Sequence, residues 1–213
     1  MTQGPSGPRG LYAAKAWYTA RLGVFVTMAV RARVSPDLFT WLGIAGGLAA
    51  AGLLAYSAAH PAAWWALAVG LALAVRLAGA NLDGAVARAR GVSRPWGFVL
   101  NEVGDRVSDL AVMLVLADLA GGWWGLVSLA GSTLPTFASL SLAGAGGARL
   151  NGGPVGKTER CALVVLVTLL APWWRLYAPA AAVIGFGGLV TAAMRLRAGA
   201  NSLGSPVTTS AAR

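Results

Sequence analysis

The sequence predicts an all-α, polytopic membrane protein, and two observations carry that prediction. Hydrophobic residues make up 57% of the 213 positions and charged residues only 11%, which is too apolar for an ordinary soluble domain. Three long stretches carry almost no charge: 38–75 has no charged residue, 110–148 has only Asp118, and 161–194 has only Arg175. Each stretch is long enough for two spans of roughly 20 residues across a hydrocarbon core about 30 Å thick. Six transmembrane helices are therefore expected.

Turn-forming residues divide each stretch where a helical hairpin needs a bend. They are His60-Pro61 in the first stretch, Gly121-Gly122 in the second, and the segment from Pro172 to Pro179 in the third. We expect helices at 36–58, 61–83, 96–120, 122–144, 159–174 and 177–196. These helices form one transmembrane domain, 35–197, between tails at 1–10 and 198–213 that we expect to be disordered.

The segment 11–34 precedes the first expected span and mixes aromatic with basic residues. Trp17 and Tyr18 are aromatic, and Arg31 and Arg33 follow an apolar run that is too short to cross a bilayer. This pattern predicts an N-terminal interfacial helix lying along the membrane surface. A partly buried first helix of the bundle is an equally open interpretation.

The basic residues predict the orientation of the chain. An even number of spans places both termini on one side, and outside the helices only Arg175 lies on the other side. By the positive-inside rule, the basic side is cytoplasmic. We therefore expect a multi-pass cell-membrane protein with both termini and its functional site in the cytoplasm. The net charge of +10 is spread over separate loops, so it fits anionic lipid headgroups better than nucleic acid, and no nucleic-acid partner is expected.

Cysteine and histidine give little functional signal. The single cysteine, Cys161, excludes an internal disulfide, and the single histidine, His60, falls in an expected turn. Neither residue type forms a metal-ligand cluster.

One polar segment, 80–109, holds four of the seven acidic residues. Asn101, Asp105 and Asp109 recur every four residues, so they line one stripe of a helix. Asp83 is followed by Gly84, which allows another backbone or a ligand to approach closely. Carboxylates beside small residues and arginines suit the joint binding of divalent cations and phosphates.

Two structural alternatives exist for these acidic residues. Asp83-Gly84 taken alone is also typical of a turn that ends a helix. Asp105 and Asp109 could instead be interhelical partners of Arg76 or Arg106, both of which fall inside expected helices.

The spacing of the segment resembles a known signature. It reads D-G-x-x-A-R, eight residues, G, three residues, an acid or amide, three residues, D, which resembles the CDP-alcohol phosphotransferase family, also called the CDP-alcohol phosphatidyltransferase family. The residues that match in register are Asp83, Gly84, Ala87, Arg88, Gly97 and Asp105. Two positions depart from the pattern, since Ala80 and Asn101 stand where the family has aspartates.

The resemblance implies an activity and a set of site residues. Members of the family transfer a substituted phosphate from a CDP-alcohol, commonly CDP-diacylglycerol, to an alcohol acceptor and release CMP, in phospholipid biosynthesis. The implied metal is Mg²⁺ or Mn²⁺, as one or two ions. Asp83 and Asp105 are the implied metal ligands, and Asp105 is also the candidate general base; Asn101 and Asp109 are further candidate ligands. The candidates for nucleotide and phosphate binding are Gly84, Ala87, Arg88 and Gly97.

A second basic group follows in the expected loop before the fifth span. The segment G-K-T-E-R resembles the basic entry to that helix in related enzymes, and Arg149, Lys157 and Arg160 are candidates for binding a phosphorylated acceptor. Their alternative role is that of membrane-edge anchors. A homodimer is implied by the resemblance alone.

Two functional hypotheses from different classes remain open at this point. The first is an active enzyme with a reduced or rearranged metal site. The second is a non-catalytic relative that binds CDP-lipid or a partner protein.

Overall fold

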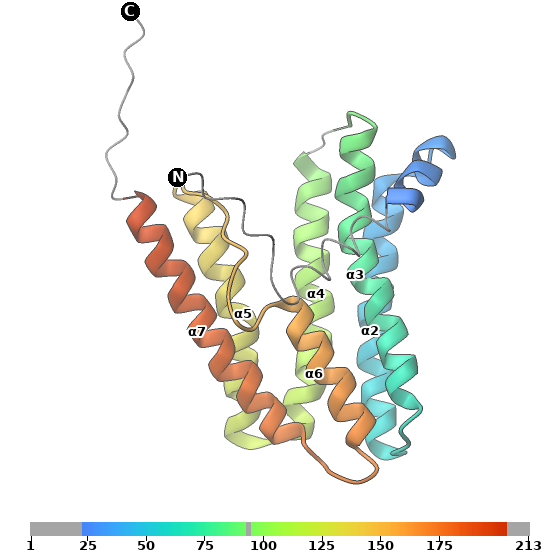
Figure 1. Cartoon of the computed structure of the whole chain (residues 1–213), viewed down its shortest axis with the longest axis vertical. Helices are drawn as coiled ribbons and strands as arrows, with labels where there is room; N and C mark the ends of the chain where they lie inside the picture. The colour runs from blue at the N-terminus through green and yellow to red at the C-terminus, as the bar shows by residue number, and fades with distance from the viewer. Residues whose placement is uncertain (1–22, 93–94, 204–213) are drawn as a thin grey trace, which may run out of the picture. The chain divides into compact units, whose positions relative to one another are not determined.

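The computed structural model describes residues 23–92 and 95–203. Within these ranges every regular element is a helix and there is no strand, which confirms the all-α prediction. Residues 23–31 are helical, and six longer helices follow them in order (Figure 1). These are α2 (Pro36–Ala59), α3 (Trp65–Ala89), α4 (Pro95–Ala120), α5 (Gly122–Gly144), α6 (Lys157–Leu170) and α7 (Tyr177–Leu203).

The chain divides into two compact units. The first unit contains the described residues up to 47 together with those of 74–108, and the second contains 48–73 with 109–203. The boundaries fall within α2, α3 and α4, so each of these helices contributes residues to both units.

In the first unit, glycines bring α2 against α3 and α4. A Cβ atom on Gly79 of α3 would lie 2.5 Å from the carbonyl oxygen of Phe39 on α2. One on Gly47 of α2 would collide with the side chain of Ser108 on α4. Small residues allow helix backbones in a membrane to approach closely.

In the second unit, α5 and α7 run side by side (Figure 1) and touch through their backbones. A Cβ atom on Gly131 of α5 would overlap the backbone of Gly185 on α7, and one on Gly188 would overlap the carbonyl group of Gly131. No side chain separates the two helices at this crossing. The pair forms the tightest helix contact in this unit.

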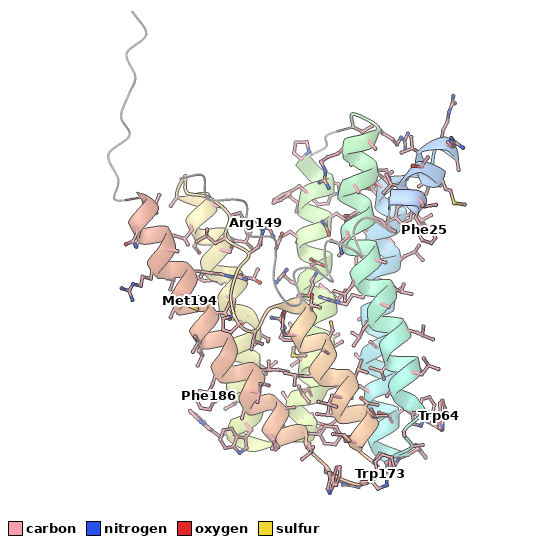
Figure 2. All side chains as sticks on the ribbon, viewed as in Figure 1. Phe25, Trp64, Arg149, Trp173, Phe186 and Met194 are labelled. Carbon is pink, nitrogen blue, oxygen red and sulfur yellow. The ribbon has the colours of Figure 1, made fainter. Side chains whose placement is uncertain are left out.

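Four helices are long and apolar enough to cross a membrane: α2, α3, α5 and α7. Large apolar side chains on them face outward, including Leu67 at 69% exposure and Phe137 at 70%, as expected for surfaces that contact lipid. Figure 2 shows Trp64 and Trp173 at the same end of the second unit, beside the starts of α3 and α7. Tryptophans at helix ends are typical of the membrane–water interface.

Two of the six expected spans, α4 and α6, do not meet the same criterion. α4 is long enough, but it carries four charged residues between positions 102 and 109, namely Glu102, Asp105, Arg106 and Asp109. α6 has only 14 residues, so it is about 21 Å long at roughly 1.5 Å per residue, less than the thickness of the hydrocarbon core. The composition and length of the described helices therefore establish four candidate spans.

Three of the predicted helices, the second, fifth and sixth, need corrected boundaries. α3 begins at Trp65 instead of 61, because the residues after Pro61 form a turn. It also continues past Asp83-Gly84 and ends at Ala89. Gly91 caps this end: its φ is 64°, and the Val92 amide donates to the Ala87 carbonyl oxygen at 3.0 Å. This is the geometry of a Schellman cap, for which glycine is the favoured residue.

The corrections at the C-terminal end concern α6 and α7. α6 spans Lys157–Leu170 instead of 159–174, since the chain turns around Pro172. α7 continues to Leu203, past the expected end at 196, so the tail expected from 198 begins with two helical turns. Gly199 explains part of this extension, because it packs directly against the Leu142 side chain of α5.

The expected interfacial helix lies only partly within the described residues. Residues 11–22 and the tails at 1–10 and 204–213 are outside them. The helical stretch 23–31 has Ala29 buried and Val24, Phe25 and Met28 more than half exposed. It ends at Arg33, whose φ is 55°, with the Val34 amide donating to the Ala29 carbonyl oxygen at 2.9 Å.

Candidate active site

The first signature residues lie on one continuous helix, α3. Asp83 is 4% exposed, and its Oδ2 accepts a hydrogen bond of 2.9 Å from the Thr40 hydroxyl group of α2. Its Oδ1 accepts a second hydrogen bond from the backbone N–H of Gly84. A buried carboxylate requires such partners, because burying an uncompensated charge is costly. Thr40 thus fixes the orientation of Asp83.

Thr40 was not among the residues that the sequence indicated. It lies 43 positions before Asp83, and its hydroxyl group is one of several on α2. Its position in α2 could have indicated this role. Thr40 lies one turn before Gly43 and Ile44, on the side of α2 that packs on α3 and α4.

Arg88 lies one turn after Gly84 on the exposed end of α3. A Cβ atom on Gly84 would lie 3.1 Å from Nη1 of Arg88, so the guanidinium group lies directly over this glycine. The absence of a side chain at position 84 therefore leaves room for the guanidinium group beside Asp83. Ala87 is half-buried on the same helix.

The remaining signature residues lie on α4. Gly97, Asn101 and Asp105 are half-buried, at four-residue intervals along the helix. The side chain of Asp105 is 18% exposed, and its Oδ2 is 3.7 Å from Nη2 of Arg106. The same Nη2 is 3.5 Å from Oε1 of Glu102, so Arg106 lies between two carboxylates of its own helix. This contact lies within α4, so it is not the interhelical pairing that was considered for Asp105.

A second arginine, Arg76, lies beside Asp105 on the facing helix. Arg76 is only 1% exposed, and its Nη2 donates a hydrogen bond of 3.4 Å to the backbone carbonyl oxygen of Asp105. It precedes Ala80 by one turn of α3 and Asp83 by two, so these three residues project from one side of that helix. The first unit therefore combines two signature carboxylates with a fully buried guanidinium group.

The donor set fits one divalent ion better than two. Asp83 and Asp105 supply carboxylates and Asn101 an amide oxygen, but Ala80 supplies no side-chain donor. Among residues 23–92 and 95–203, no group of three or more Asp, Glu, His or Cys side chains is placed to hold a metal ion. Mg²⁺ commonly binds through one or two carboxylates together with substrate phosphates. Two carboxylates give half the negative charge of the four-aspartate pattern.

Asp109 and Arg160 form an ion pair in the second unit. Nη2 of Arg160 donates to Oδ2 of Asp109 at 2.6 Å, and the two side chains are 5% and 12% exposed. The sequence indicated Asp109 as a metal ligand and Arg160 as an acceptor-binding residue. In the structure these two candidates bind each other. They are 51 residues apart in the sequence, so no local pattern could predict the pair.

The other acceptor candidates, Arg149 and Lys157, flank a loop. Arg149 is exposed before the loop (Figure 2), and Lys157 is half-buried in the first turn of α6. The start of α6 is closed by Glu159, whose Oε2 accepts a hydrogen bond of 2.9 Å from the Gly156 amide. Lys157 therefore lies at a helix N-terminus, where backbone N–H groups favour anions.

Side chains from α5 and α7 hold this loop in place. The Ser139 hydroxyl group donates to the Leu150 carbonyl oxygen at 2.7 Å. Arg195 donates to the carbonyl oxygens of Gly152 at 2.9 Å and Pro135 at 2.7 Å. Thr191, which is fully buried, accepts a hydrogen bond of 3.2 Å from the Val155 amide. The loop thus has a defined path between α5 and α6.

The helices and the polar residues together define a class of protein. Membrane-length helices combined with a buried arrangement of carboxylates and arginines are typical of an integral-membrane enzyme that acts on phosphate-containing substrates. The family profile of the CDP-alcohol phosphatidyltransferases matches residues 33–194, and the chain belongs to this family. It is therefore a membrane transferase of phospholipid biosynthesis.

Individual relatives agree with the family assignment. A phosphatidylinositol phosphate synthase of Mycobacteroides abscessus is 33% identical over 186 residues, which cover 83% of this chain and 82% of the relative. The inner membrane protein YnbA of Escherichia coli is 34% identical over 128 residues, covering 58% of this chain and 63% of the relative.

Solved structures show the same fold. The phosphatidylinositol phosphate synthase of Mycobacterium tuberculosis with CDP-DAG bound has a TM-score of 0.67 and 23% identity, over 84% of this chain and 94% of that one. The same enzyme in complex with manganese and citrate has a TM-score of 0.67 over 89% of its length, with 84% of this chain covered, also at 23% identity.

Proposed function

We propose that this chain transfers a phosphatidyl group from CDP-diacylglycerol to a phosphorylated alcohol and releases CMP. The observation that carries the proposal is the retention of Asp83 and Asp105 in register, with Asp83 buried and fixed by Thr40. The name of the Mycobacteroides abscessus relative supports the choice of a phosphorylated acceptor. An oriented carboxylate at this position suits a metal-assisted phosphoryl transfer.

The donor nucleotide is assigned to the signature residues of the first unit. Gly84, Ala87 and Gly97 leave space for the cytidine diphosphate group, and Arg88 contacts its phosphates by charge-assisted hydrogen bonds. Its guanidinium group already lies over Gly84, so it needs little rearrangement to meet a phosphate there. Holding the diphosphate in one orientation lowers the barrier to in-line displacement.

Asp105 is the proposed general base. Its carboxylate accepts the proton of the acceptor hydroxyl group, whose oxygen forms a new bond to the phosphorus atom that carries the lipid. The bond from this phosphorus to the oxygen bridging the two phosphates breaks, and CMP leaves with the electron pair. Arg106, at 3.7 Å from Oδ2, helps to orient the carboxylate.

Asp83, Asp105 and the amide oxygen of Asn101 are the proposed ligands of one Mg²⁺ or Mn²⁺ ion. When bound, the ion supplies positive charge to the diphosphate group. The complex of the Mycobacterium tuberculosis enzyme with manganese supports the choice of metal. We leave Asp109 outside this set, because its carboxylate group binds Arg160.

Lys157 and Arg149 are the proposed contacts of the acceptor phosphate. Lys157 combines its own charge with the N-terminus of α6, and the loop between the two residues is held by Ser139, Thr191 and Arg195. Arg160, whose guanidinium group binds Asp109, supports the acceptor site by holding the first turn of α6.

We further propose that α4 and α6 also lie within the bilayer, which gives six spans in the cell membrane with both termini and the site in the cytoplasm. The basic residues of the loops support this orientation. The exposed apolar side chains of residues 23–31 support a position at the membrane surface. The homodimer stays a prediction.

The test is CMP release from CDP-diacylglycerol by the purified full chain with Mg²⁺ or Mn²⁺. The acceptor panel pairs inositol phosphate with inositol and glycerol phosphate with glycerol, and Asp105→Ala is the control. We expect release only with a phosphorylated acceptor and none from the control. Metal-dependent binding of CDP-diacylglycerol without release for any acceptor would refute the proposal.

A further inference from the structure

Arg76 is an unusual residue for its place in α3. It is the first charged residue after an uncharged stretch that begins at 38, and it is 1% exposed in a helix of membrane length. An arginine at such a position is costly and is typically retained for a function. No role has been assigned to it in the transfer reaction above.

The position of Arg76 relates it to the substituted metal site. It shares one side of α3 with Ala80, where the family signature has an aspartate, and with Asp83. Its Nη2 donates to the Asp105 backbone at 3.4 Å, so the guanidinium group lies at the contact between α3 and α4, beside Asp105. The arginine and the missing aspartate are separated by one helical turn.

The charge balance of the site follows from these residues. Four carboxylates and two divalent ions would sum to zero net charge. Here Asp83 and Asp105 contribute two negative charges, which one divalent ion balances, and Arg76 adds one fixed positive charge. Arg106 and Glu102, 3.5 Å apart on α4, offset each other. A second divalent ion would have to bind beside a guanidinium group and without the Ala80 carboxylate, and both differences oppose its binding.

We propose that Arg76 is a built-in positive charge that opposes the binding of a second divalent ion, so that the site holds a single ion. Arg76 is a positioning residue, since it acts through Asp105 and the field of the site without contacting the substrate. The inference rests on the proposed function, because it assumes that Asp83 and Asp105 form the metal site.

The test measures Mn²⁺ binding to the full chain in detergent micelles, by calorimetry and by electron paramagnetic resonance, without any substrate. The wild-type chain is expected to bind one Mn²⁺ ion. Arg76→Met removes this positive charge and is expected to raise the Mn²⁺ affinity about tenfold or more, because a nearby positive charge no longer opposes the cation. Arg76→Lys keeps the charge and should stay within about threefold of wild type.

A double variant tests directly whether Arg76 opposes the binding of a second ion. Arg76→Met combined with Ala80→Asp is expected to bind two Mn²⁺ ions, whereas Ala80→Asp alone should still bind one. Arg195→Met is the matched control, since Arg195 also donates to backbone carbonyl groups but belongs to the second unit. This variant should bind Mn²⁺ as the wild type does.

The sign of the affinity change separates the proposal from a purely structural role. A structural arginine would lower Mn²⁺ affinity, or leave it unchanged, when replaced by methionine, and either result in a folded variant would overturn the proposal. Wild-type binding of two ions would also overturn it. If Arg76→Met does not fold, Ala80→Asp still tests the proposal, because two bound Mn²⁺ ions in that variant would overturn it. Failure of the proposed function appears separately, as absent CMP release with Mn²⁺ binding intact.

Discussion

Replacing Thr40 with valine removes the hydroxyl group that donates to the buried carboxylate of Asp83 at 2.9 Å, while the size of the side chain is kept. Asp83 is 4% exposed, so water cannot readily replace the lost donor. Leaving a buried charged acceptor short of a partner costs about 1 to 3 kcal/mol. We expect the free energy of unfolding to fall by this amount, and CMP release to fall about tenfold, since 1.4 kcal/mol corresponds to a factor of ten.

The assay pairs CMP release with unfolding in mixed micelles, and Thr40→Ser is the matched control. Serine keeps the donor and loses only a methyl group, which lies 3.6 Å from the position that a Cβ atom on Gly104 would occupy. The serine variant should retain activity within about threefold. A valine variant with wild-type stability and wild-type CMP release would refute the view that Thr40 fixes Asp83.

Three further perturbations test other parts of the structure. Gly131→Val places a side chain against the Gly185 backbone and should lower the free energy of unfolding by about 3 kcal/mol or more. Gly52→Val, at a position with open space, should not lower it. If both variants lose the same free energy of unfolding, and the same fraction of folded protein in size-exclusion chromatography, the contact between Gly131 and Gly185 is contradicted. Lys157→Gln should raise the KM for the phosphorylated acceptor about tenfold with kcat nearly unchanged, and steady-state kinetics showing an unaltered KM would remove Lys157 from the acceptor site. Ala80→Asp combined with Asn101→Asp should increase CMP release less than about threefold if the natural site is adapted to fewer carboxylates; activity that appears only in this double variant would identify the wild-type chain as a non-catalytic relative.

The helix boundaries that the sequence predicted well are those set by local breakers. α2, α4 and α5 begin and end within about one residue of expectation, because Pro36, Pro95 and Gly121-Gly122 act on their own backbone. The end of α3 was predicted wrongly, because two glycines follow one another within eight residues and either could end the helix. Gly91 adopts the left-handed conformation and ends it, while Gly84 stays helical.

The candidate residues of the site follow a local spacing, but their contacts do not. Asp83 and Asp105 were named from a fixed spacing, and their assignment as site residues stays a prediction. Thr40 and the pair of Asp109 with Arg160 depend on contacts across 43 and 51 residues, which no local pattern encodes. The six expected spans were inferred from uncharged length. The length and composition of the helices establish four of them, because α4 carries several charged residues and α6 is short.

The glycine crossing of α5 and α7 has a consequence for how this gene can change. Every missense change of a glycine codon adds at least one heavy atom, so no single-base substitution at Gly131, Gly185 or Gly188 produces a smaller residue. The atoms that such a side chain would meet belong largely to the opposing backbone. A second substitution on the partner helix therefore cannot make room for it. Variation at this crossing should be rare among viable descendants, whatever substrate they come to use.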